Sequence, residues 1–215
     1  MPNEPLLATA QAAVHPLRPE PSSDAAAAAS VRLAQWQLLT EHLAGVLYAP
    51  LTCGDVPAQV NQCAGMLRRL VHEDADLAIF LVVNDHPGKL ARYSAAHALH
   101  TATLVSLIAR RKDWSPATEL CGIQAALTMN IAMTQLQDEL AQQSSPLTPE
   151  QRQIVHQHPL AGRRLLMQLG VTDTDWLDAV LQHHEQAEQA GRSHKVSDVV
   201  RSGWRHQLNR DSGRL

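Results

Sequence analysis

The kind of apolar residue in this chain most constrains its fold. Hydrophobic residues make up 45% of the 215 residues, but Phe, Trp and Tyr together supply only 3%. The apolar share is therefore carried mainly by Ala, Leu and Val, which suits closely packed helices better than a sheet. Apolar residues also recur at helical spacing through most of the chain. The sequence thus predicts an all-α protein.

Helix boundaries follow from proline, glycine and capping residues. We expect helices over residues 24–48, from about 55 to past 71, and over 94–112, 116–140, 149–170 and 174–189. The run 77–83 is apolar on every side and is readable as helix or strand. Thr148, with Gln151 three residues later, should cap one helix start, and Gly170 should end that helix. Pro159 should interrupt it, because proline removes an internal hydrogen bond, so His158 is expected at a junction between two helices.

Composition divides the chain into four segments. Residues 1–24 contain five prolines and no apolar period, which predicts a disordered arm. A helical N-terminal region (25–83), a central helical domain (84–191) and a basic tail (192–215) follow. The tail has six Lys or Arg, two Asp and few large apolar residues. We therefore expect it to be mobile and to leave the apolar face of the preceding helix exposed, including Leu177 or Leu181, in a marginally stable, self-associating or partner-dependent chain.

Charge and segment composition exclude several functions. A net charge of −3 gives no general attraction to nucleic acid or to an anionic membrane. No apolar run approaches the roughly 20 residues that span a bilayer, and the N-terminus lacks the pattern of a secretory signal. Three widely spaced cysteines fit reduced thiols, so a cytoplasmic location is expected. The chain contains no Gly-rich phosphate loop, no Ser-His-Asp order and no Cys-x-x-Cys pair.

Four histidines stand at a spacing typical of metal sites: His97, His158, and the adjacent pair His183 and His184. Neutral imidazole is a ligand for zinc, manganese and iron. One interpretation is a weak mononuclear site built from His97, His158 and His184, because two adjacent residues cannot both lie on one narrow helix face. The alternative is that these are structural histidines on helix faces.

The order of motifs around these histidines resembles a known enzyme family. The segments are YSAAH at 93–97, AALTMNI at 125–131, HPLAG at 158–162 and HHE at 183–185. Together they resemble the HD-GYP branch of the HD-domain metal-dependent phosphohydrolases, helical enzymes that hydrolyse cyclic dinucleotides. The resemblance implies a helical HD-domain-like bundle, with the four histidines named above as metal ligands.

The chain departs from the family pattern at its centre. The family has a His-Asp pair followed, after two residues, by a Lys, whereas Met129, Asn130 and Met133 stand here. A thioether is a poor ligand for these ions, and a neutral amide cannot replace a bridging carboxylate. The GYP loop is replaced by residues 188–193, and no distal Asp stands in a matching motif.

These departures predict a degenerate domain with no catalytic residue and at most one weakly bound divalent metal (iron, manganese or zinc) or none. The expected function is non-catalytic signalling, in which a decayed phosphodiesterase domain binds a protein partner, associates with itself or binds a cyclic dinucleotide. The alternative function is a metal-dependent phosphohydrolase with residual activity on cyclic-di-GMP or a related phosphodiester. A third interpretation is a domain truncated after the paired histidines.

Overall fold

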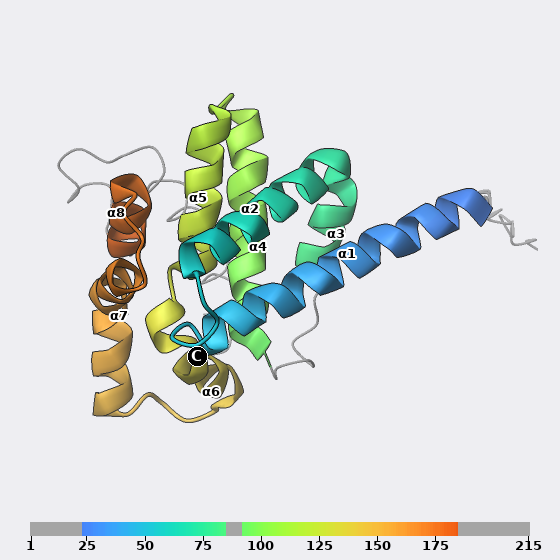
Figure 1. Cartoon of the computed structure of the whole chain (residues 1–215). Helices are drawn as coiled ribbons and strands as arrows, with labels where there is room; N and C mark the ends of the chain where they lie inside the picture. Colours follow the sequence, from blue (N-terminus) through green and yellow to red (C-terminus); the bar gives the residue numbers. More distant parts are fainter. Residues whose placement is uncertain (1–22, 85–91, 185–215) are drawn as a thin grey trace, which may run out of the picture.

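The computed structural model describes residues 23–84 and 92–184, and within these ranges it contains helices but no strand (Figure 1). In chain order the elements are α1 (Ser23–Tyr48), α2 (Val56–Glu73), α3 (Ala75–Asn84), α4 (Tyr93–Arg111), α5 (Pro116–Thr128), the 3-10 turn η2 (Ile131–Met133), α6 (Thr134–Gln142), α7 (Pro149–Gln168) and α8 (Thr174–Gln182). The predicted all-α fold is confirmed, and the ambiguous run 77–83 is helical. The basic tail and nearly all of the predicted disordered arm lie outside the described residues.

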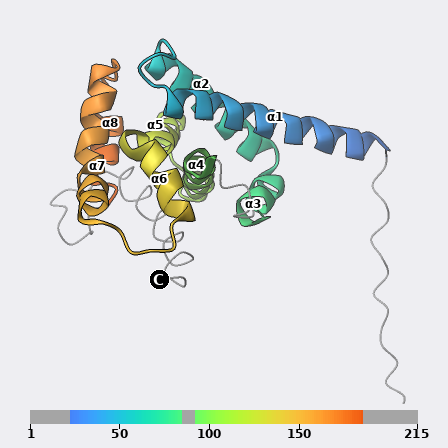
Figure 2. The same cartoon turned by 90° about the horizontal axis from the view of Figure 1, so that it is seen from below.

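Helices α4 and α5 lie side by side at the centre of the bundle, with α2 across them and α7 and α8 on one flank (Figures 1 and 2). Small residues let α4 approach its neighbours closely. Ala95, Ala102 and Ala109 recur every seven residues and are fully buried. One hydrophobic core contains side chains from α1 to α8, so it is continuous across residue 84.

The C-terminal half of α1 packs on this bundle, whereas its N-terminal end extends beyond the other helices (Figures 1 and 2). Leu39, Leu43 and Val46 of α1 are fully buried. Val31 and Leu33, nearer the N-terminus of the helix, are exposed. The hydrophobic contacts that hold α1 are therefore concentrated in its second half.

Several predicted helix ends are confirmed. The hydroxyl of Thr148 accepts a hydrogen bond from the Gln151 backbone, and the Gln151 side chain accepts one from the Thr148 backbone, which completes a capping box. Gly170 has φ +95°, a left-handed conformation that favours glycine just after a helix.

The single helix predicted over residues 116–140 is wrong. It breaks after Thr128, and Asn130 has φ −106° and ψ 13°. Tertiary hydrogen bonds explain the break: Ser94 at the start of α4 donates its hydroxyl to the Thr134 carbonyl and its backbone N–H to the Asp138 carboxylate. The same carboxylate accepts a hydrogen bond from the Tyr48 hydroxyl. These contacts turn α6 across the ends of α1 and α4.

The predicted interruption at Pro159 is also wrong, because α7 continues from Pro149 to Gln168 with Pro159 inside it. His158 therefore lies within a helix and not at a junction. The expectation that Leu177 or Leu181 is exposed is wrong for Leu177, of which only 4% is exposed. Helix α8 packs against α5 and α7, and these two helices cover its apolar face. Leu181 is partly buried.

Candidate metal centre

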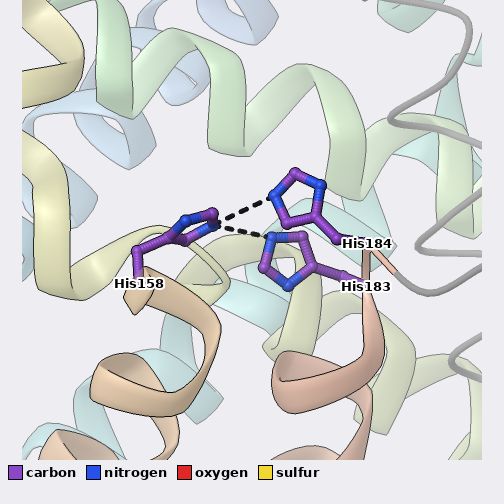
Figure 3. Close-up of side chains that lie close together, drawn as sticks. All are labelled: His158, His183 and His184. Atoms are coloured by element: carbon purple, nitrogen blue, oxygen red, sulfur yellow. Dashed lines mark hydrogen bonds between the residues drawn. The ribbon is translucent and has the colours of Figure 1, made fainter. Parts of the chain in front are cut away.

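His158 projects from the middle of α7 toward the end of α8 (Figure 3). Its side chain is 1% exposed. The Nδ1 atom lies 2.5 Å from the carbonyl oxygen of Val155, one turn earlier in the same helix. Because a carbonyl only accepts, Nδ1 carries the proton, and the Nε2 atom of the neutral ring has a free lone pair.

His183 and His184 both reach this ring because α8 ends before them. The last helical residue is Gln182, and the turn that follows directs the two adjacent imidazoles toward His158 (Figure 3). Ring centroids lie 5.0 Å apart for His158 and His183, 4.8 Å for His158 and His184, and 4.2 Å for His183 and His184. Two adjacent histidines cannot share one narrow face of a continuing helix, but here the helix has ended at Gln182.

The nitrogen atoms of the three rings converge on one point. The Nε2 atom of His158 lies 3.0 Å from Nε2 of His183 and 3.2 Å from Nε2 of His184. His183 donates its Nδ1 proton to the Val180 carbonyl at 2.6 Å, so in its neutral ring Nε2 is the acceptor nitrogen, as it is in His158. Two acceptor nitrogens 3.0 Å apart repel each other unless a cation lies between them. A metal ion at this point would be coordinated by both.

Burial keeps the three rings neutral. Burial lowers the pKa of His158, and the hydrogen bond to Val155 offsets only part of this decrease. Burial, together with the charges of the neighbouring imidazoles, holds the pKa of His183 well below 6.5. Burial and the nearby His158 lower the pKa of His184 to about 4. At neutral pH each of these imidazoles therefore holds a single proton, and its other ring nitrogen is available as a metal ligand.

The geometry fits a divalent ion of the zinc type. One nitrogen from each ring lies within 4.8 Å of the other two. A tetrahedral ion with bonds of roughly 2.0–2.1 Å places its ligand nitrogens about 3.4 Å apart, close to the observed 3.0 and 3.2 Å. No carboxylate of the described residues joins this group, and Glu185 lies just outside them. We call His158, His183 and His184 the histidine triad.

His97, the fourth predicted ligand, does not belong to the triad. It lies on α4, is 5% exposed, and neither ring nitrogen has a hydrogen-bond partner among the described residues. Its ring packs against Tyr93 at a centroid distance of 5.7 Å. Burial, with a smaller contribution from His100, lowers the pKa of His97 to about 4. His97 also contributes to the lowered pKa of His183, so the two rings are close enough to interact electrostatically.

Met129, Asn130 and Met133, at which the sequence departs from the motif that it resembles, are buried. Met129 is 1%, Asn130 8% and Met133 9% exposed. Both polar atoms of the Asn130 amide are buried, and no residue of the described ranges forms a hydrogen bond with them. Helix α7 lies close to this segment at Gly162, where a Cβ atom would lie 3.6 Å from the Met129 carbonyl oxygen, an ordinary van der Waals contact. The segment that carries the neutral amide and the two thioethers therefore packs against α7.

A second buried polar cluster, around Glu119, was not predicted from the sequence. The Glu119 carboxylate is 3% exposed and accepts hydrogen bonds from Ser106 at 2.7 Å and from Arg68 at 2.7 Å, and it pairs with His72 at 2.8 Å. It thus ties α5 to α2 and α4. Glu119 lies in the first turn of its helix, where an acidic residue is ordinary, so the sequence carried no signal for this role.

Comparison with known proteins places the chain in a family. No curated protein and no solved structure matches it. In the described part, no helix is long and apolar enough to cross a membrane. A family model described as HD domain matches residues 80–198, which include the histidine triad and Asn130. HD domains typically bind divalent metals, as the triad geometry also indicates. Because the match covers more than half of the sequence, the chain belongs to the HD-domain family.

Proposed function

We propose that this chain is a non-catalytic signalling or partner-binding protein, built on an HD domain of the HD-GYP type that has lost hydrolysis. The observation that carries the proposal is the Asn130 amide. It is buried without a hydrogen-bond partner in the part of the chain that the structure describes, at the position where the motif order leads us to expect a bridging carboxylate. An amide has no charge with which to hold two cations around one oxygen.

The triad would still hold one metal ion. When bound, such an ion supplies a Lewis acid that lowers the pKa of a coordinated water. The chain itself contributes three neutral imidazoles. Two of them, His158 and His183, donate their Nδ1 protons to backbone carbonyls and so direct Nε2 toward the ion. Nitrogen-only coordination favours zinc, cobalt or nickel over magnesium or calcium, which prefer oxygen.

A second candidate function is a metal-dependent phosphohydrolase with residual activity on cyclic-di-GMP or a related phosphodiester. The preserved triad favours it, because one Lewis-acidic ion can polarise a phosphoryl oxygen without a second ion. Against it, Met133 replaces the Lys that would contact the phosphate, and Met133 is only 9% exposed. We therefore favour a non-catalytic function over residual hydrolytic activity.

A hydrolysis assay separates the two functions. Purified chain loaded with zinc or manganese is incubated with cyclic-di-GMP, next to His183→Ala and a double variant, Met129→His with Asn130→Asp. We expect wild type and His183→Ala to release product at the same background rate. Turnover by wild type that disappears in His183→Ala would contradict the non-catalytic proposal. Activity gained only by the double variant would support the role given to Asn130.

The partner-binding part of the proposal is supported by an exposed apolar face on α3. Ile79 is 46%, Phe80 57% and Val83 55% exposed, and the three lie within one helical turn. Grouped exposure of large apolar side chains commonly marks an interaction surface. A second copy of the chain or another protein would cover this face.

A further inference from the structure

The proline inside α7 changes which groups can use the Val155 carbonyl. In an α-helix, each N–H donates to the carbonyl four residues earlier, so the donor for Val155 is residue 159. Pro159 has no N–H and its ring is crowded against that carbonyl, which weakens the helical ladder at this point. The carbonyl oxygen of Val155 is therefore left without its regular helical donor.

His158 uses this oxygen. Its Nδ1 atom lies 2.5 Å from the Val155 carbonyl, and this bond determines which ring nitrogen bears the proton. With the proton on Nδ1, the Nε2 lone pair points at Nε2 of His183, 3.0 Å away, and at Nε2 of His184, 3.2 Å away. The vacancy that Pro159 creates in the helical ladder thus orients a ring of the triad.

His183 reaches the same arrangement by another route. Its Nδ1 atom lies 2.6 Å from the carbonyl of Val180, which belongs to the last turn of α8. Carbonyls in the last turn of a helix are not all used by the helical ladder. His158 lies ten residues before the end of its helix, where the helical ladder normally uses every carbonyl. A carbonyl becomes available to His158 only where the residue four positions later, such as a proline, has no N–H to donate.

We propose that Pro159 is a positioning residue for the metal centre, because it leaves the Val155 carbonyl to the imidazole of His158 and so presents the Nε2 lone pair to the ion. The effect on metal affinity rests on the metal centre proposed above. The effect on the protonation pattern of His158 does not require a metal.

The substitution Pro159→Ala distinguishes positioning from mere support of the fold. Alanine is a far better residue in a helix interior than proline, so the variant should have a higher Tm. Its new N–H would donate to Val155 and compete with His158. We therefore expect zinc affinity to fall by about 10-fold or more, the range seen when a group that orients a metal ligand is lost. A gain in stability together with a loss of affinity is the signature of positioning.

Two measurements complete the test. Zinc affinity is measured by competition with a chromophoric chelator on wild type, Pro159→Ala and the control Pro149→Ala. Pro149 begins the same helix, where no helical donor is needed, so its replacement should leave the affinity unchanged. Nitrogen NMR of the metal-free chain should show the His158 proton on Nδ1 in wild type and a shift toward Nε2 in Pro159→Ala.

The outcomes are distinguishable. An unchanged protonation pattern at His158 in Pro159→Ala would overturn the inference, as would an unchanged zinc affinity in a wild type that binds zinc. A variant that loses both stability and affinity would also overturn it, since Pro159 would then be structural. If no chain binds zinc but the protonation pattern still shifts, the metal centre fails and the positioning of His158 stands.

Discussion

The Nε2 atoms of His158 and His183 face each other 3.0 Å apart, and each ring donates its Nδ1 proton to a backbone carbonyl. Two neutral imidazoles held this way each offer a lone pair to the same point. Their pKa values are lowered, mainly by burial, so a proton is a poor occupant at neutral pH. The pair is therefore arranged as two metal ligands, with His184 as the third.

Removing one ring of the triad should greatly weaken metal binding. We expect His158→Ala to weaken zinc binding by about 100-fold or more, because loss of a ligand should cost more affinity than loss of a group that only orients a ligand. His156→Ala is the matched control, because His156 lies on the same helix with an exposed side chain outside the triad. Isothermal titration with zinc measures both. Equal affinities in the two variants would show that the triad is not the binding site.

The Glu119 cluster should contribute to stability through its charge. Glu119→Gln keeps the shape but weakens the hydrogen bonds to Arg68 and His72, and we expect a loss of about 2 kcal/mol in the free energy of unfolding at pH 7. Chemical denaturation measures it. Glu139→Gln, on the exposed side of α6, should show no comparable loss.

The difference in unfolding free energy between wild type and Glu119→Gln should depend on pH. Burial alone would raise the pKa of Glu119, but hydrogen bonds from Ser106, Arg68 and His72 outweigh it and hold the pKa below 4.5. A lowered folded-state pKa means that the unfolded chain binds more protons as pH falls. The advantage of wild type over Glu119→Gln should be constant above about pH 5.5 and shrink below pH 4.5. A constant difference down to pH 3 would contradict this account.

The exposed face of α3 should mediate association. Phe80→Ser removes its largest side chain, which is 57% exposed, so folding stability should change by only about 0.5 kcal/mol. Light scattering over a concentration series should show self-association in wild type and less in the variant. Leu51→Ser is the control, because Leu51 is 78% exposed but lies in the loop between α1 and α2. Association that is unchanged by Phe80→Ser would exclude this face.

The features that could be predicted from the sequence are those that depend on neighbouring residues or on composition. The capping box at Thr148 and the stop at Gly170 depend on neighbouring residues only, and the composition was decisive for helices over strands. The break at Asn130 depends on hydrogen bonds between Ser94 and α6, which no local pattern reveals. These contacts overrode helical periodicity.

The candidate site was predicted in part for the same reason. The order and spacing of the motifs selected four histidines as candidates, but whether their side chains converge depends on where helices end. Both His183 and His184 reach His158 because α8 stops at Gln182, whereas α7 continues through Pro159. His97, on a different helix, stays apart from the triad. Tertiary packing decided which ligands meet.

The number of metal ions bound per chain shows whether the Asn130 position can still help to hold a second ion. Elemental analysis is made on wild type, His183→Ala and the double variant Met129→His with Asn130→Asp, each purified with zinc or manganese in excess and then desalted. The account predicts at most one equivalent in wild type and loss of the ion in His183→Ala, because the neutral Asn130 amide cannot bridge a second ion. Two or more equivalents of metal in wild type, reduced in His183→Ala, would contradict it.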